Sequence, residues 1–122
     1  MSEVVVDLRL ASRAGESCTV VEVGGQLDMD TVPQLDGFLR DVADDGAARV
    51  VLDLTDVSFL DSSGLGLLVA WLKELSAAGG WLRLAGVQQL VAYVLQVSAV
   101  DRAVDRYASV AAAEASGPPL PS

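Results

Sequence analysis

Apolar positions recur along this chain with the periods of strands and helices, and the first segments predict a β-hairpin. Over residues 4–10 every second residue is apolar, which predicts a half-buried strand. Residues 13–16 include Gly15 and predict a turn. Residues 18–23 then predict a second strand, and the simplest arrangement pairs it with the first strand as an antiparallel hairpin.

A loop at residues 24–30 leads to the first predicted helix. Thr31 is a suitable N-cap residue, Gln34 can complete a capping box with it, and Pro33 is tolerated in a first helical turn. The helix continues as an apolar stripe with helical spacing, formed by Leu35, Phe38, Leu39 and Val42. Two aspartates and a glycine at residues 44–46 predict its end.

The middle of the chain holds its most apolar strand. Residues 49–54 form a nearly continuous apolar run broken by Asp53, as is typical of a central strand covered on both faces. A short link at residues 55–60 follows this strand. The segment therefore predicts the centre of a sheet.

The strongest helical pattern covers residues 64–78. One face carries leucines at helical spacing, namely Leu65, Leu68, Leu72 and Leu75. Leu67 and Trp71 form a second, adjacent stripe, and such a stripe usually belongs to the core. Because the helix is apolar over more than one face, part of the helix is also a candidate contact for a partner. Gly79 and Gly80 predict the C-terminal cap.

The remaining elements complete an α/β pattern. Residues 81–85 predict a short strand, and residues 87–97 predict a third apolar helix. A last short strand is expected within residues 100–107, and a helical turn or two at residues 108–115.

Alternation of strands and helices predicts one α/β domain with right-handed crossovers. We expect a mixed, mostly parallel sheet of about four to five strands, with an N-terminal antiparallel hairpin and about four packing helices. The domain is expected to span residues 1–115, followed by a flexible Pro-rich tail at residues 116–122.

The amino-acid composition of the chain argues against several classes of function. The net charge of −9 argues against direct nucleic-acid binding, which needs clustered Lys and Arg. No signal peptide and no membrane-spanning run are recognisable, and a single cysteine, Cys18, fits a reducing cytoplasm. The chain has no histidine, so Ser-His-Asp and Cys-His catalysis are excluded, and we expect a protein that is not an enzyme.

The strongest candidate for chemistry is the segment Asp61-Ser62-Ser63-Gly64-Leu65-Gly66, between the central strand and the following helix. A helix N-terminus offers unpaired N–H groups and the positive end of the helix dipole, which suit an anion. Ser62 either caps the helix or accepts a phosphate. Gly64 and Gly66 favour the second interpretation, because glycine is costly inside a helix and permits close approach to the backbone.

Other acidic residues suggest weaker alternatives. Asp28 and Asp30 are either solvated loop acids or, with Asp53, Asp56 and Asp61, part of a metal site; the spacing matches no calcium loop, so we predict no metal. Asp53 could resemble the phosphoacceptor of a receiver domain, but no acidic pair follows the first strand, and no lysine follows a late strand. We therefore predict that Asp53 is a strand-end or helix-capping acid. The glycine-rich segments lack the lysine of a phosphate loop, so no cofactor is expected.

Three segments together carry a family resemblance. Residues 51–66 read Val-Leu-Asp-Leu-Thr-Asp-Val-Ser-Phe-Leu-Asp-Ser-Ser-Gly-Leu-Gly. Gly25-Gln26-Leu27-Asp28, with Thr31 beyond it, precedes them, and Gly79-Gly80 precedes the strand Leu82-Arg83-Leu84. In this order the chain resembles a bacterial anti-sigma-factor antagonist, a stand-alone domain of the type shared with sulfate transporters (the STAS domain), over about residues 4–108. The family often has a Thr/Ser-Gly-Leu turn after the third helix, whereas residues 93–100 here lack the glycine.

The resemblance implies a partner-switching role. In this family the antagonist binds an anti-sigma factor that is also a serine kinase, is released when that kinase phosphorylates it, and is reset by a serine phosphatase. The phosphorylated residue would be Ser62, with Ser63 a minor candidate. A partner-binding surface would include Asp28, Asp61, Ser63, Gly64 and Leu65. Two alternatives stay open: a scaffold whose Ser62 is never phosphorylated, and an accessory subunit of a membrane transport complex.

Overall fold

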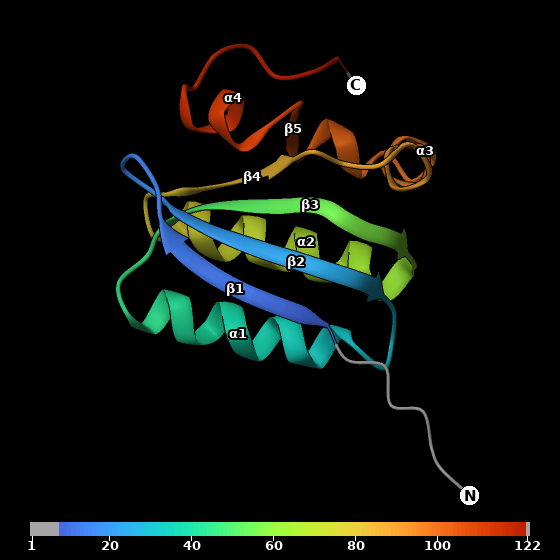
Figure 1. The fold of residues 1–122 in the computed structure, drawn as a ribbon, viewed down its shortest axis with the longest axis horizontal. Coiled ribbons are helices and arrows are strands. Elements are labelled where there is room, and N and C mark those ends of the chain that lie inside the picture. The colour runs from blue at the N-terminus through green and yellow to red at the C-terminus, as the bar shows by residue number, and fades with distance from the viewer. Residues whose placement is uncertain (1–7, 122) are drawn as a thin grey trace, which may run out of the picture.

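A computed structural model describes residues 8–121 of the chain and shows alternating strands and helices (Figure 1). In chain order they are β1 (Arg9–Ala14), β2 (Thr19–Leu27), α1 (Val32–Asp44), β3 (Arg49–Leu60), α2 (Ser62–Ala77), β4 (Trp81–Ala85), α3 (Gln89–Val97), the 3-10 helix η1 (Val100–Arg102), β5 (Asp105–Tyr107) and α4 (Val110–Glu114). Among the described residues, no helix combines the length and the apolar character needed to cross a membrane.

The strands form one five-stranded sheet in the order β1-β2-β3-β4-β5. Strands β1 and β2 are antiparallel, and every other neighbouring pair is parallel. The predicted fold class, a mostly parallel α/β sheet with an N-terminal antiparallel hairpin, is therefore confirmed. Strand β3 lies at the centre, and its residues Val50, Val51 and Leu52 are at most 1% exposed, as expected for a strand covered on both faces.

Two apolar clusters hold the layers together. The larger cluster joins one face of the sheet to α1, α2 and α3, and includes Leu35, Leu52, Leu68 and Leu95. The smaller cluster lies where α4 covers β3 and β4, and includes Val51 and Ala113. In Figure 1, α1 and α4 accordingly lie on opposite sides of the sheet. Burial of aliphatic side chains on both faces is the main stabilising contribution to the fold.

Strands β2 and β3 are longer than their sequences predict. The predicted loop from residue 24 and the predicted link at residues 55–60 instead pair with each other, with Gly25 opposite Val57 and Leu27 opposite Leu60. The pairing is irregular between Glu22 and Gly24 and again between Gly25 and Gln26. These bulges let a glycine-rich segment remain in the ladder, which local propensity alone does not indicate.

The hairpin and the start of α1 also differ from expectation. The predicted first strand at residues 4–10 falls largely outside the described residues; β1 runs to Ala14, so the turn lies at residues 15–18 rather than 13–16. Thr31 is the N-cap residue of α1 and Pro33 lies in its first turn, but the predicted capping box does not form. The Thr31 hydroxyl donates to the carbonyl oxygen of Gln26 at 2.6 Å, and Gln34 Oε1 accepts the N–H of Leu8 at 3.0 Å.

The turn after α3 forms although the chain lacks the glycine that relatives often have there. Ala99 adopts the left-handed conformation with φ of 64°, which costs a residue with a Cβ atom about 1–2 kcal/mol. Helix η1 and strand β5 follow, where a single short strand was expected. Residues after α4 contact the sheet edge: Leu120 N donates to Arg106 O at 2.7 Å, and Tyr107 Oη donates to Gly117 O at 3.2 Å. The flexibility of residues 116–122 stays a prediction.

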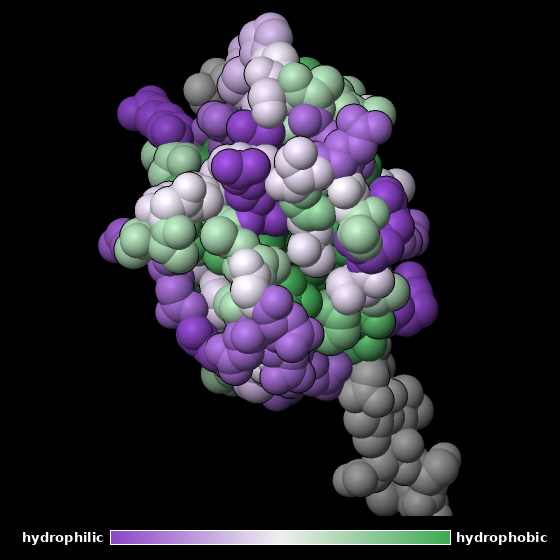
Figure 2. Space-filling model, turned by 90° about the vertical axis from the view of Figure 1, so that its left-hand side faces the viewer, coloured by the Kyte–Doolittle hydropathy of each residue, from purple (hydrophilic) through white to green (hydrophobic). Residues whose placement is uncertain are grey.

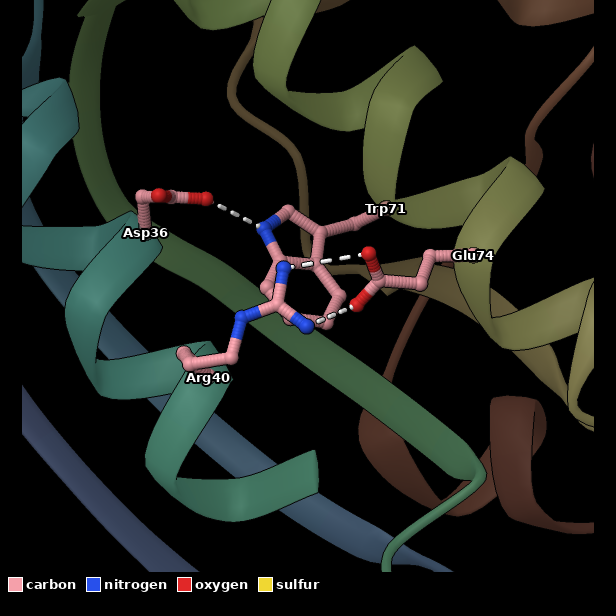
Figure 3. Close-up of polar contacts among 4 residues, drawn as sticks. All are labelled: Asp36, Arg40, Trp71 and Glu74. Atoms are coloured by element: carbon pink, nitrogen blue, oxygen red, sulfur yellow. Dashed lines mark hydrogen bonds and ion pairs between the residues drawn. The ribbon is translucent and has the colours of Figure 1, made fainter. Parts of the chain in front are cut away.

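Helices α1 and α2 are joined by a cluster of four side chains (Figure 3). The indole N–H of Trp71 donates to Asp36 Oδ1 at 2.8 Å, and the guanidinium of Arg40 lies 4.5 Å from the centre of the Trp71 ring. Arg40 also donates to both carboxylate oxygens of Glu74, and this hydrogen bond raises the pKa of the Arg40 guanidinium above its ordinary value. The cluster therefore links α2, whose first residue is Ser62, to α1.

Candidate functional site

The Asp61–Gly66 segment lies where two parallel strands end side by side. Figure 1 shows β2 and β3 ending at the same side of the molecule, where α2 begins. The N–H of Asp61 donates to the carbonyl oxygen of Leu27 at 3.0 Å, so the loop that follows β2 meets the loop that precedes α2. The structure thus brings Asp28 and Asp61 to one edge of the sheet, and their role in binding a partner stays a prediction.

Asp61, not Ser62, caps helix α2. Asp61 Oδ1 accepts the N–H groups of Ser63 at 2.8 Å and Gly64 at 3.2 Å. Ser62 is the first helical residue and is exposed, and among the described residues nothing forms a hydrogen bond with its hydroxyl. The interpretation of Ser62 as the capping residue is therefore wrong, and its hydroxyl stays accessible.

Asp28 organises the neighbouring loop. Its Oδ1 accepts the N–H of Asp30 at 2.9 Å and the N–H of Thr31 at 3.1 Å, while its own N–H donates to Thr31 Oγ1 at 3.0 Å. Thr31 is only 3% exposed, so the loop is anchored to the domain. Asp28 is thus a structural loop acid that lies beside Asp61.

The sequence analysis did not identify Met29, at the tip of this loop, as a candidate functional residue. It is 75% exposed, although methionine usually packs in cores. Exposed methionine is common at binding surfaces, because its flexible thioether adapts to different partners. The sequence does contain a feature that predicts its exposure: Met29 lies between two aspartates and belongs to no apolar stripe of a strand or helix.

The two glycines beside the serines have different surroundings. Gly64 is buried, and a Cβ atom there would lie 2.7 Å from Leu60 Cδ1 and 3.2 Å from Leu27 Cβ. Gly66 is exposed, and a Cβ atom there would meet nothing within 4 Å. Gly64 is therefore required by packing within the domain, whereas packing does not explain Gly66.

We expect alanine at these two positions to change stability in opposite directions. Gly66→Ala should raise the free energy of unfolding by about 1 kcal/mol, the helix-propensity difference. Gly64→Ala should lower it by about 1–3 kcal/mol, because Leu60 and Leu27 are fully buried and cannot move aside freely. Urea denaturation followed by circular dichroism measures both values. Gly37→Ala in α1 is the matched control, since a Cβ atom there also meets nothing within 4 Å; equal changes at residues 64 and 66 would contradict the packing argument.

The other acidic candidates do not gather into a site. Among residues 8–121 no group of three or more Asp, Glu, Cys or His side chains could hold a metal ion. Asp53 lies inside β3, not at a strand end or a helix cap as predicted, and its Oδ1 accepts the Thr55 hydroxyl at 2.6 Å. Strand β3 continues past it because its second half pairs with β2.

Burial determines the role of the second apolar stripe of α2 and affects the reactivity of Cys18. Trp71 and Leu67 are 2% and 7% exposed and pack in the larger apolar cluster, so the interpretation of their stripe as core is confirmed. Burial and the nearby carboxylate of Glu114 raise the pKa of the Cys18 thiol above its ordinary value. The thiol is therefore mostly protonated at neutral pH, the form with poor nucleophilicity.

Comparisons with known proteins identify the family of the chain. The family model described as "Mlab, STAS domain" matches residues 10–106. The anti-sigma-B factor antagonist of Staphylococcus aureus (strain NCTC 8325 / PS 47) is 32% identical over 93 residues, which cover 76% of this chain and 86% of that protein.

Two solved structures show the same fold. A proposed anti-sigma factor antagonist from Thermotoga maritima matches with a TM-score of 0.80 and 25% identity, over 85% of this chain and 90% of that chain. The anti-sigma factor antagonist SpoIIAA in its unphosphorylated form matches with a TM-score of 0.72 and 25% identity, over 88% of this chain and 94% of that chain. The chain therefore belongs to the STAS domain family, and the relatives it resembles include anti-sigma factor antagonists.

Proposed function

We propose that this protein is a cytoplasmic anti-sigma-factor antagonist whose binding to an anti-sigma factor kinase is switched off by phosphorylation of Ser62. The observation that carries the proposal is the free, exposed Ser62 hydroxyl at the first position of α2, with the capping role taken by Asp61. The related SpoIIAA has been solved in an unphosphorylated and a phosphorylated form, which supports a modification of this kind in the family.

The local electrostatics explain how a phosphate would act. Asp61 Oδ1 already accepts the N–H groups of Ser63 and Gly64, so a phosphate would compete with a carboxylate for the donors of the first turn. It would add about −1.5 to −2 charges beside Asp61. The helix dipole favours an anion at this end, so the fold survives and the repulsion acts on the docked partner.

The partner surface would surround Ser62. We place Asp28, Asp61, Ser63 and Leu65 on it, and add Met29 as its exposed apolar contact. Gly64 is buried and would contribute by allowing the start of α2 to pack against Leu60, which sets the position of its neighbours. A surface that combines exposed apolar and polar residues is typical of protein–protein contacts.

Phosphorylation in vitro tests the proposal. The protein is incubated with ATP, Mg²⁺ and, in turn, each purified anti-sigma factor kinase of its organism, and the product is mapped by mass spectrometry. We expect one phosphate on Ser62, none on Ser62→Ala, and an unchanged phosphate on the matched variant Ser63→Ala. A serine phosphatase should remove it. A phosphate found on another residue, or binding without any modification, would contradict the switch, and the latter would favour the scaffold role.

A further inference from the structure

Strand β5 forms one of the two edges of the sheet, and the segment that follows α4 lies against its outer side (Figure 1). The carbonyl oxygen of Tyr107 accepts the N–H of Gly86, which follows β4, at 3.0 Å. Carbonyls of successive strand residues point to opposite sides, so the carbonyl of Arg106 points away from β4. It accepts the N–H of Leu120 at 2.7 Å. The outer edge of β5, which would otherwise be a template for another strand, is therefore occupied.

Residues 117–121, called the strap below, are also held by side chains of β5. Tyr107 Oη donates to the carbonyl oxygen of Gly117 at 3.2 Å. Arg106 Nη2 donates to the carbonyl oxygen of Pro121 at 3.1 Å. Together with the backbone hydrogen bond, these contacts connect both ends of the strap to two consecutive residues of one strand.

The domain also fixes the turn that leads into the strap. Ser116 has a φ of 57°, a left-handed conformation that a residue with a Cβ atom keeps when its surroundings impose it. Arg83 Nη1 donates to Ser116 Oγ at 2.8 Å and to the carbonyl oxygen of Ala113 at 2.8 Å. The Arg83 guanidinium in turn lies 3.7 Å from the centre of the Trp81 ring. Strand β4 therefore sets the point at which the chain leaves α4 and turns toward β5.

The sequence of the strap suits a segment that covers an edge without extending the sheet. Prolines have no backbone N–H, so Leu120 supplies the only N–H over residues 118–121, and β5 accepts it. The outer side of these four residues thus offers no donor to a further strand. Proline also restricts its own φ and the conformation of the residue before it, so little backbone entropy is lost when the strap docks.

The side chains of this region contribute little specific character. In Figure 2 the top of the molecule, where α4 and the strap lie in Figure 1, is pale, which indicates residues that are neither strongly hydrophilic nor strongly hydrophobic. Leu120 is the large apolar residue of the strap, and it is 42% exposed, so more than half of its surface is covered. Recognition of the strap therefore depends mainly on its extended backbone and its single N–H.

We propose that the outer edge of β5 is a docking site for an extended proline-rich segment, and that the chain's own strap occupies it and closes it to other chains. The segment that fits supplies one backbone N–H to Arg106 O, between prolines, and carbonyl oxygens for the side chains of Tyr107 and Arg106. Covalent attachment gives the strap an effective concentration on the order of millimolar at this edge, so a free segment binds only when the strap is open. The proposal does not depend on phosphorylation of Ser62.

Amide hydrogen exchange of the full chain, followed by NMR, tests whether the strap is docked. We expect the Leu120 N–H to exchange about tenfold or more slowly than in the free peptide Gly-Pro-Pro-Leu-Pro-Ser. Tyr107→Phe keeps the ring packed but removes the hydroxyl that donates to Gly117, and should raise the Leu120 exchange rate about threefold to tenfold. Tyr93→Phe is the matched control and should leave this rate unchanged, because Tyr93 is 62% exposed and forms no hydrogen bond among the described residues.

A peptide titration followed by NMR tests the docking site itself. Leu120→Pro removes the only N–H of residues 118–121 but leaves the acceptor, Arg106 O, in place. This variant should bind the peptide Gly-Pro-Pro-Leu-Pro-Ser at millimolar concentration, with shifts of the Arg106 and Tyr107 amide signals. The parent should bind it about tenfold or more weakly, because its own strap competes. The peptide Gly-Pro-Pro-Pro-Pro-Ser lacks the central N–H and should bind neither protein.

Each experiment has an outcome that would overturn the proposal. A Leu120 N–H that exchanges as fast in the protein as in the peptide would favour the flexible tail that the sequence predicts. Equal binding of the two peptides, or no binding of the first peptide to Leu120→Pro, would show that β5 accepts no such segment. Equal binding of the first peptide to the parent and to Leu120→Pro would show that the strap does not close the edge. None of these results changes the phosphate mapping at Ser62.

Discussion

Replacing Trp71 by alanine should lower the free energy of unfolding by about 3–5 kcal/mol, a large part of the 5–15 kcal/mol typical of a domain. The side chain is 2% exposed and belongs to the larger apolar cluster between α2 and the sheet. Its removal would leave a cavity and would also remove the indole that lies against Arg40 and donates to Asp36. Urea denaturation followed by far-UV circular dichroism measures the loss without relying on tryptophan fluorescence.

Two further variants separate packing from the polar contacts of this cluster. Asp36→Asn keeps an oxygen acceptor for the indole N–H and should cost less than about 1 kcal/mol, whereas Asp36→Ala removes the acceptor and should cost about 1–2 kcal/mol. Glu74→Gln breaks an exposed ion pair with Arg40 and should have little effect. A cost for Trp71→Ala no larger than that of Asp36→Ala would show that packing between the helices contributes less than the hydrogen bond.

The architecture was predictable because its signals are periodic and local. The apolar run of β3, the leucine stripe of α2 and the short strand at residues 81–85 each appear at the predicted place. The second halves of β2 and β3 were not predictable, because Gly24, Gly25 and Asp56 have low strand propensity. The second halves of β2 and β3 become strands by pairing with each other. This pairing joins segments far apart in the chain, so no local sequence pattern predicts it.

The residue that caps α2 also could not be predicted from local sequence. Asp61 and Ser62 are both good N-cap residues, so the sequence could not decide which one caps α2. The decision comes from β3: Leu60 is buried opposite Leu27, and the N–H of Asp61 donates to Leu27 O. This pairing places Asp61 at the N-cap position, so the Asp61 carboxylate caps α2 and the hydroxyl of Ser62, the first helical residue, takes no part in capping. The position of the free hydroxyl is therefore set by contacts with β2, a strand far away in the sequence.

If the proposed function is correct, replacing Ser62 by aspartate should weaken binding to the anti-sigma factor kinase about 100-fold, equivalent to about 2.7 kcal/mol. The new carboxylate would stand at an exposed position beside Asp61, and the partner would have to desolvate it without a matching positive group. Ser62→Ala removes only a hydroxyl that forms no hydrogen bond among the described residues, and should bind within a few-fold of the parent. Isothermal titration calorimetry with the purified kinase, without ATP, measures all three affinities.

The matched control places the same charge elsewhere on the same helix. Ser76 is exposed near the other end of α2, fourteen residues from Ser62 and about 21 Å away along the helix axis, beyond the Debye length at physiological salt. Ser76→Asp gives the same net charge as Ser62→Asp and should bind as the parent does. If both variants lost affinity equally, the effect would come from net charge rather than from the proposed docking surface around Ser62. If neither lost affinity, Ser62 would lie outside that surface, and a phosphate there could not release the partner by repulsion.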